Sequence, residues 1–471
     1  MQTGHPTRLV PDTSPPGGPA DGAAPQNGPA PAPTGAERLG WLDALRGIAA
    51  IAVALHHGCY HYLPQFRHEI LRWLDPGNSG VLLFFLVSGY IIPASLERTG
   101  SARRFWISRL FRIYPLLLAV LAVTLLLAVT GLMPLRQRLG EAYDPLGAIA
   151  AHLTMMQDLL AVPSALNVLW TLSYEMIFYL LVVALFALGR LDRHSASIAT
   201  ALAVAALGLG VLLPTAALSR DHGITTVAVT AALVMAAAIA LACSSRTRLA
   251  RTGALLGGAL AAVLLLGNAR VEAWEGLALL AVMFAGTAIH RAERGQISVR
   301  AAAVAVTAVL AAAIGGGLWH ITVYAPGQTE FVLKRAWTIG ILVTALVFAL
   351  GMALRRRRVP RWLTRLGLIS YSVYLVHPVL LIVSDITIGR PRADAPLLLV
   401  PYLVAVLLVS HLTYRWIEAP LQRLGRRLAR RTAPVLREGA LPDGADAAPA
   451  AAESTAKTAP TTAAKAAAGD A

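Results

Sequence analysis

The chain has 471 residues, of which 56% are hydrophobic and only 14% are charged. Its mean hydropathy of +0.61 is typical of an integral membrane protein and excludes an ordinary soluble domain. The net charge of +16 does not indicate nucleic-acid binding, because the arginines gather in short connectors between apolar segments, where they act as topology signals. The only two cysteines, Cys59 and Cys243, exclude a disulfide framework and a cysteine-rich metal site.

The two ends of the chain differ in composition from the rest. Residues 1–38 are rich in Pro, Gly and Ala, and they predict a disordered tail rather than a signal peptide. Residues 423–471 begin with basic residues and become Ala-rich, which predicts a second disordered tail. An integral membrane domain is therefore expected over residues 39–422. The excess of arginine over lysine and the abundant alanine fit a high-GC bacterium, so we expect a multi-pass protein of a bacterial plasma membrane.

Twelve apolar runs lie between the tails, and most can cross a hydrocarbon core with about 20 residues. They begin near residues 43, 79, 115, 168, 196, 224, 253, 276, 301, 336, 370 and 397. The runs at 253–267 and 276–290 are short. We therefore expect an all-α, polytopic bundle of 10–12 transmembrane helices, with ten if the short pair is re-entrant. Basic connectors follow every second run, which predicts that these connectors and both termini are cytoplasmic.

The first run carries two ionisable side chains on one face. In WLDALRGIAAIAVALHH, Arg46 and His57 are eleven residues apart. At about 100° per residue this is three turns plus roughly 20°, which places the two side chains on one helix face about 16 Å apart. Ionisable groups inside a membrane segment are costly and usually mark a functional site.

A cationic, aromatic connector follows the second run. In SARRFWISRLFRIYP, Arg109 and Arg112 are three residues apart and share a face if the segment is helical. Such a pair suits phosphate oxygens, although basic loops also serve topology and contact lipid headgroups. The preceding run, GVLLFFLVSGYIIP, contains Ser88 and Gly89, whose small side chains allow a helix or a ligand to come close.

The fourth run, NVLWTLSYEMIFYLL, buries a carboxylate at Glu175. From the expected topology it lies about 11 Å below the outer surface, and His57 lies at about 9 Å. This shared depth predicts a pair in which Glu175 fixes the tautomer of His57 and raises its basicity, as a general base for a hydroxyl requires. The alternative is a pair that only locks two helices together.

Two later runs also carry polar side chains. In ISYSVYLVHPVLL, Tyr371, Tyr374 and His377 are spaced by three and lie near one face. Tyr371 is expected to be an interfacial anchor or a satisfied packing group, whereas His377 sits deeper in the run. The last run ends in SHLTYRWIEAPLQRL, where Arg415 and Glu418 predict a juxtamembrane ion pair before a helix stop.

Six blocks of the sequence, in order, resemble the membrane-bound acyltransferase-3 family of multi-span O-acyltransferases, and the resemblance covers nearly all of residues 39–422. They are LDALRGIAAIAVALHH with its Arg-x10-His pair, FFLVSGY, RLFRIYP, LWTLSYEMIFY, SYSVYLVHP and TYRWIEAPL. The departures are mild. His56 precedes the matched histidine, and Tyr174 and Met176 flank Glu175 where the family often has Val and Trp, changes expected to affect acceptor fit more than chemistry.

The resemblance implies transfer of an acyl group, often acetyl, from cytoplasmic acyl-coenzyme A to a hydroxyl of a carbohydrate or glycosylated small molecule. Acyl-coenzyme A (acetyl-CoA) is then a co-substrate, and no bound cofactor, metal or nucleic acid is expected. The acceptor is either a cell-envelope polysaccharide or a metabolite such as a glycosylated macrolide, and the remaining partner is membrane lipid. An amine or peptide acceptor is a further alternative.

Roles for the candidate residues follow from this reaction. The coenzyme A phosphates are expected at three arginines, Arg46, Arg109 and Arg112. His57, oriented by Glu175, is expected to deprotonate the acceptor hydroxyl, and the oxyanion is expected at polar groups such as Ser88, Tyr374 or His377. An acyl-enzyme on His57 or Ser88 is an open variant. The alternative function is a secondary transporter or flippase, although the inverted repeats typical of transporters are not evident.

Overall fold

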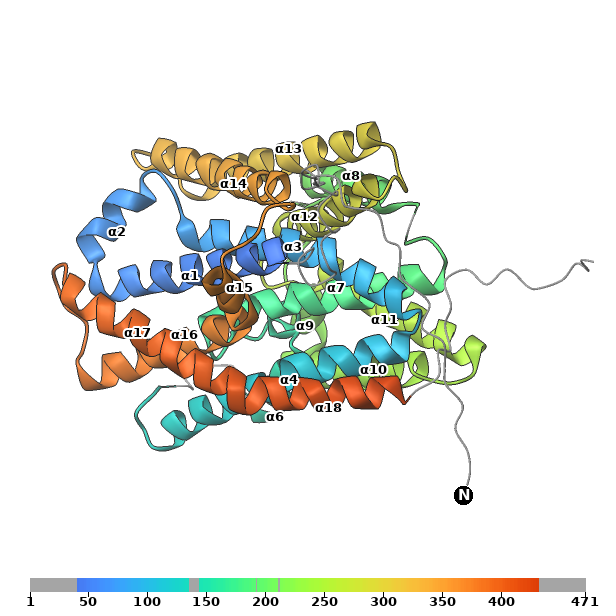
Figure 1. Ribbon diagram of the computed structural model, residues 1–471, viewed down its shortest axis with the longest axis horizontal. Helices are drawn as coiled ribbons and strands as arrows, with labels where there is room; N and C mark the ends of the chain where they lie inside the picture. Colours follow the sequence, from blue (N-terminus) through green and yellow to red (C-terminus); the bar gives the residue numbers. More distant parts are fainter. Residues whose placement is uncertain (1–39, 135–143, 192, 211, 432–471) are drawn as a thin grey trace, which may run out of the picture.

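The computed structural model describes residues 40–134, 144–191, 193–210 and 212–431. Over these ranges the chain is helical and has no strand, which confirms the all-α class (Figure 1). The helices are α1 (Gly40–Tyr62), α2 (Pro64–Leu71), α3 (Pro76–Thr99), α4 (Ala102–Val129), α6 (Pro145–Thr154), α7 (Trp170–Ala187), α8 (Ser195–Gly208), α9 (Ala217–His222), α10 (Ile224–Ala242), α11 (Thr247–Gly267), α12 (Ala273–Glu293), α13 (Val299–Tyr324), α14 (Glu330–Ala353), α15 (Arg361–Leu368), α16 (Ser370–Thr387), α17 (Pro396–Thr413) and α18 (Ala419–Arg430). The predicted tail 1–38 and residues 432–471 of the second predicted tail lie outside the described residues.

Ten helices of the described chain are long and apolar enough to cross a membrane, a number within the predicted range. The pair predicted to be short is not short, because α11 and α12 each have 21 residues. Both helices extend beyond the apolar runs 253–267 and 276–290, because polar residues at their ends are helical as well. Two of the twelve predicted runs are not among these ten candidate membrane spans. They are α8, which has only 14 residues, and α1, which has 23 residues but carries several ionisable groups.

The bundle has one end where arginines collect. There α3 ends and α4 begins, α12 ends and α13 begins, and α14 ends just before the run Arg355–Arg358. We call this the arginine-rich end. That it faces the cytoplasm, together with both termini, stays a prediction from the positive-inside rule.

Close helix crossings hold the centre of the bundle together. A Cβ atom on Gly89 of α3 would collide with the backbone of Met283 in α12, so only glycine permits this crossing. The hydroxyl of Thr287 in α12 donates to the carbonyl of Gly89 at 2.8 Å. Gly89 is therefore a packing residue, and it fixes the position of the neighbouring Ser88.

The last helix is longer than the sequence suggested. A π-helical turn, Tyr414–Glu418, joins α17 to α18, and α18 lies along α4, below it in Figure 1. Residues 423–430 are thus helical, which corrects the predicted start of the tail. The predicted Arg415–Glu418 ion pair is not formed, because the π turn changes the angular spacing and turns Glu418 inward, where it accepts hydrogen bonds from Ser372 and Gln422.

Candidate active site

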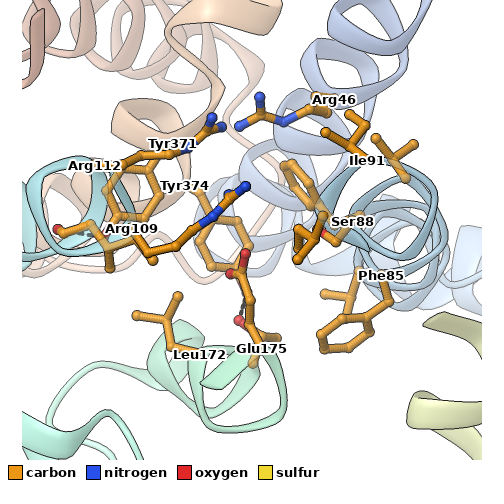
Figure 2. A pocket seen from close by; sticks show the side chains of 16 residues that line it. Arg46, Phe85, Ser88, Ile91, Arg109, Arg112, Leu172, Glu175, Tyr371 and Tyr374 are labelled. Atoms are coloured by element: carbon orange, nitrogen blue, oxygen red, sulfur yellow. Dashed lines mark hydrogen bonds between the residues drawn. The ribbon is translucent and has the colours of Figure 1, made fainter. Parts of the chain in front are cut away.

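A cavity lies between α1, α3, α4, α7 and α16, and it brings most of the predicted site together (Figure 2). Six of the eight candidate residues line it: Arg46, Ser88, Arg109, Arg112, Glu175 and Tyr374. Most of the remaining wall is apolar or aromatic, including Val81, Phe84, Phe85, Ile91, Ile92, Ile113, Leu172 and Tyr371. Residues from five helices far apart in sequence therefore meet at one place.

The three arginines enter from two helices. Arg46 comes from α1, and Arg109 and Arg112 come from α4, where their spacing of three places both on the cavity face as predicted. Figure 2 shows their guanidinium groups turned toward a common space above the Glu175 carboxylate. Arg46 has a further acidic neighbour in Asp43, whose Oδ1 is 4.0 Å from its Nη1 and which does not line the cavity. The cavity thus holds more cations than anions.

Arg109 is the most deeply placed of the three, with only 8% of its surface exposed. Its guanidinium lies over the rings of Phe105 and Tyr179, 5.2 and 5.4 Å from their centroids. Its Nε is buried without a hydrogen-bond partner among the described residues. A buried donor without a partner costs about 1–3 kcal/mol, and more when charged, so this nitrogen is suited to an anionic ligand.

Glu175 does not pair with His57, which corrects the sequence-based prediction. Its carboxylate accepts a hydrogen bond from the Tyr179 hydroxyl at 2.5 Å, one turn further along α7. His57 Nδ1 instead lies 3.0 Å from Nε2 of His377 in α16. The depths of two residues in a membrane fix their heights but not the directions in which they point, and here Glu175 faces the arginines while His57 faces α16.

The hydrogen bonds around the two histidines define their tautomers. His377 is fully buried, and its Nδ1 lies 2.9 Å from the carbonyl oxygen of Val373, so this nitrogen donates. In neutral His377, Nε2 is then the acceptor, and it accepts the Nδ1 proton of His57. This leaves Nε2 of His57 with a free lone pair, the state that a general base requires.

Tyr374 stands between the histidines and the cavity. It lines the cavity, and its ring lies 6.1 Å from the ring of His377 and 5.5 Å from that of Phe84. Its hydroxyl is held by Thr171 Oγ1 at 2.9 Å and by the carbonyl of Val168 at 3.1 Å. Neither histidine lines the cavity, so the site has an arginine compartment and a histidine compartment that adjoin at Tyr374.

Of the two roles expected for Tyr371, the structure supports a satisfied packing group and not an interfacial anchor. Tyr371 lines the cavity, and its hydroxyl donates to the carbonyl of Ile113 at 2.9 Å. The run of α16 that contains it packs inside the bundle and not at its rim, which hydropathy alone does not reveal.

A polar chain missed in the sequence leads from His57 toward the opposite end of the bundle. His61 Nδ1 lies 3.1 Å from the carbonyl of His57, and its Nε2 lies 3.2 Å from Oδ2 of Asp385. Asp385 also accepts from Arg390 at 2.8 Å, and this hydrogen bond raises the pKa of Arg390 above its ordinary value. The sequence did contain a sign of this polar chain, because His57 and His61 are four residues apart and therefore share a helix face.

Comparison with known proteins identifies related chains. A family model described as an acyltransferase domain, Acyl_transf_3, matches residues 39–415. Nodulation protein 10 of Rhizobium leguminosarum bv. viciae is 34% identical over 145 residues, which are 28% of this chain and 39% of that protein. The peptidoglycan O-acetyltransferase OatA of Listeria monocytogenes is 29% identical over 152 residues, 30% of this chain and 23% of that protein.

Acyltransferase MdmB of Streptomyces mycarofaciens is 31% identical over 153 residues, which cover 30% of this chain and 38% of that protein. The match therefore spans less than half the length of each of these three relatives. No solved structure matches the chain.

Proposed function

Because the chain belongs to the membrane-bound acyltransferase-3 family and is a multi-pass membrane protein, we propose that it is an O-acyltransferase. It moves an acyl group, most simply acetyl, from acyl-coenzyme A to a hydroxyl of a carbohydrate or glycosylated small molecule. Relatives named as an O-acetyltransferase and an acyltransferase support this reaction class. The observation that carries the proposal is the convergence of Arg46, Arg109 and Arg112 on one cavity beside the His57–His377 pair.

The arginines bind the donor. Coenzyme A carries its charge on phosphates, and guanidinium groups form strong, charge-assisted hydrogen bonds with phosphate oxygens. The unpartnered Nε of Arg109 and the excess of positive charge favour such an anion. The cavity volume of about 100 Å³ is small beside the pockets of drug-sized ligands, so the cavity takes the phosphates at the three arginines and not the whole coenzyme. The nucleotide part remains at the arginine-rich end, on the cytoplasmic side expected for the donor.

His57 acts as the general base. Its Nε2 takes the proton of the acceptor hydroxyl while the hydroxyl oxygen attacks the thioester carbonyl. The resulting imidazolium is stabilised through its Nδ1 hydrogen bond to His377, and its proton then passes to the departing coenzyme A thiolate. For the thioester to reach His57, the ring of Tyr374 turns aside. A relay through an acyl-enzyme on His57 or Ser88 uses the same groups.

Two assignments change from those made on the sequence. His377 takes over the orienting role first given to Glu175, because it is the residue bonded to His57. Glu175, held by Tyr179 below the guanidinium groups, partly neutralises the arginine cluster when the donor is absent. Ser88 lines the cavity and keeps its proposed role as a donor to the oxyanion.

The proposal is tested by release of coenzyme A thiol from acetyl-coenzyme A. The purified protein is assayed in detergent with a panel of acceptors that includes simple sugars, cell-envelope polysaccharide fragments and glycosylated macrolides. We expect release that depends on one class of acceptor. A protein that binds no acetyl-coenzyme A and releases no thiol with any acceptor would contradict the proposal and favour the transporter alternative.

A further inference from the structure

A second, larger cavity lies between α3, α12, α13 and α14, and its volume is about 580 Å³. This volume lies within the range of small-molecule binding sites, roughly 300–1,000 Å³. Helix α3 separates it from the candidate active site, since Leu82 and Leu86 line the second cavity while Phe85 and Ser88 line the first. All four helices around it are candidate membrane spans, so the cavity lies at membrane depth.

The cavity exists because the residues around it are small. Seven of its lining residues are alanines, namely Ala285, Ala292, Ala302, Ala303, Ala313, Ala345 and Ala349. Nearly all the others are aliphatic or aromatic. The one polar side chain along its length, Thr344, already donates to the carbonyl of Gly340 at 2.9 Å. The wall therefore offers no hydrogen bond to water or to a polar ligand, and it suits an apolar chain.

Charged side chains appear only at one end of the cavity. There Arg355 Nε donates to Glu293 Oε1 at 2.7 Å, and Glu293 also accepts from the Tyr90 hydroxyl. This end is the arginine-rich end, where α12 and α14 end and α13 begins. Other exposed arginines follow directly in the chain: Arg294, Arg300, Arg356, Arg357 and Arg358. Glu293 pairs with Arg355 alone among these arginines, so positive charge remains in excess at the mouth.

We propose that this cavity binds one acyl chain of an anionic phospholipid, with the lipid phosphate among the arginines at the mouth. At membrane depth the surrounding medium is hydrocarbon, so an acyl chain and not water fills an apolar space that opens there. The clustered arginines select an anionic headgroup, because basic side chains near the membrane surface attract anionic lipids. The bound chain braces α13 and α14 against α3 and α12. This inference does not depend on the proposed reaction.

The occupancy is tested by native mass spectrometry. The protein is reconstituted in nanodiscs of equal parts phosphatidylglycerol and phosphatidylcholine and then released into the spectrometer. We expect one retained phospholipid, mainly phosphatidylglycerol. Ala345→Phe fills the middle of the cavity and should lose the lipid. Ala311→Phe makes the same change at an exposed position of α13 outside the cavity and should keep it.

A second variant and a competitor keep the test decisive. Ala349→Phe, at a more exposed position of the same wall, should also lose the lipid if Ala345→Phe does not fold. Replacing Arg356, Arg357 and Arg358 together by glutamine should retain a lipid but abolish the preference for phosphatidylglycerol. Equal lipid retention in the filled variants and the Ala311→Phe control would overturn the proposal. Displacement of the lipid by palmitoyl-coenzyme A would also overturn it and assign the cavity to a long-chain donor.

Discussion

Nδ1 of His57 lies 3.0 Å from Nε2 of His377, and the other ring nitrogen of His377 is committed to the carbonyl of Val373. This chain of two hydrogen bonds crosses from α1 to α16 and fixes which nitrogen of His57 carries the proton. The free lone pair of His57 therefore depends on a residue 320 positions away in sequence.

Substitution of His377 by phenylalanine removes the acceptor of the His57 Nδ1 proton. Both tautomers of His57 then become accessible, so we expect kcat to fall by about 10²-fold, the lower part of the range for general base catalysis, while the donor Kd stays unchanged. The pH profile of kcat should also shift, which a purely structural role would not produce. His68→Phe, at an exposed position of α2, serves as the control, and an unchanged kcat in His377→Phe would refute the orienting role.

Substitution of Arg109 by alanine should act mainly on donor binding, by raising the Kd for acetyl-coenzyme A. A charge-assisted hydrogen bond contributes about 1.5–3 kcal/mol, so the Kd for acetyl-coenzyme A should rise about 10- to 100-fold. Arg112→Ala should act in the same direction, and Arg109→Lys should restore binding only in part, since lysine lacks the planar fork. Arg72→Ala, an exposed change just before the start of α3 and far from the arginine-rich end, should bind as the wild type does. Titration calorimetry measures the four variants and the wild type, and equal affinities in all of them would exclude the arginine cavity as the donor site.

Glu175→Gln separates the two roles considered for this carboxylate. The glutamine still accepts the Tyr179 hydrogen bond but no longer neutralises the arginines. We expect donor affinity equal to or higher than that of the wild type, and turnover within about tenfold of it. A loss of turnover by about 10⁴-fold with unchanged binding would instead assign Glu175 to His57, as the sequence had suggested.

Asp158 provides a stability prediction away from both cavities. This buried carboxylate, in the segment between α6 and α7, accepts from the Tyr174 hydroxyl at 3.0 Å and from Arg270 Nε at 3.2 Å. Asp158→Ala leaves the Tyr174 hydroxyl buried without a partner and should destabilise the protein by about 1–3 kcal/mol. A thermal unfolding scan should show a lower midpoint while the Kd for acetyl-coenzyme A is preserved. An unchanged midpoint would mean that water replaces the carboxylate.

The sequence predicted the arginine compartment well, for a physical reason. Arg109 and Arg112 lie on one helix face because helical periodicity is local, and Arg46 meets them because basic connectors place helix ends at the same side of a membrane. The predicted pairing of Glu175 with His57 was wrong. The position of a residue along its helix fixes its depth in the membrane, but the direction in which its side chain points depends on how α1, α7 and α16 pack.

Other features depend on geometry that a one-dimensional pattern does not carry. The π turn at Tyr414–Glu418 changes the angular spacing of Arg415 and Glu418, so a pair predicted from i,i+3 spacing is absent. The second cavity arises from alanines on α12, α13 and α14 that face one another only after the bundle forms. Each of these alanines alone looks like an ordinary residue of a membrane helix.

The measurement that tests the account most directly compares His57→Ala with the wild type in two assays on the same preparation. One is binding of acetyl-coenzyme A, and the other is acceptor-dependent release of coenzyme A thiol. The account predicts wild-type donor affinity in His57→Ala, with thiol release reduced by at least about 10²-fold. Thiol release at the wild-type rate in His57→Ala would contradict the assignment of His57 as the general base.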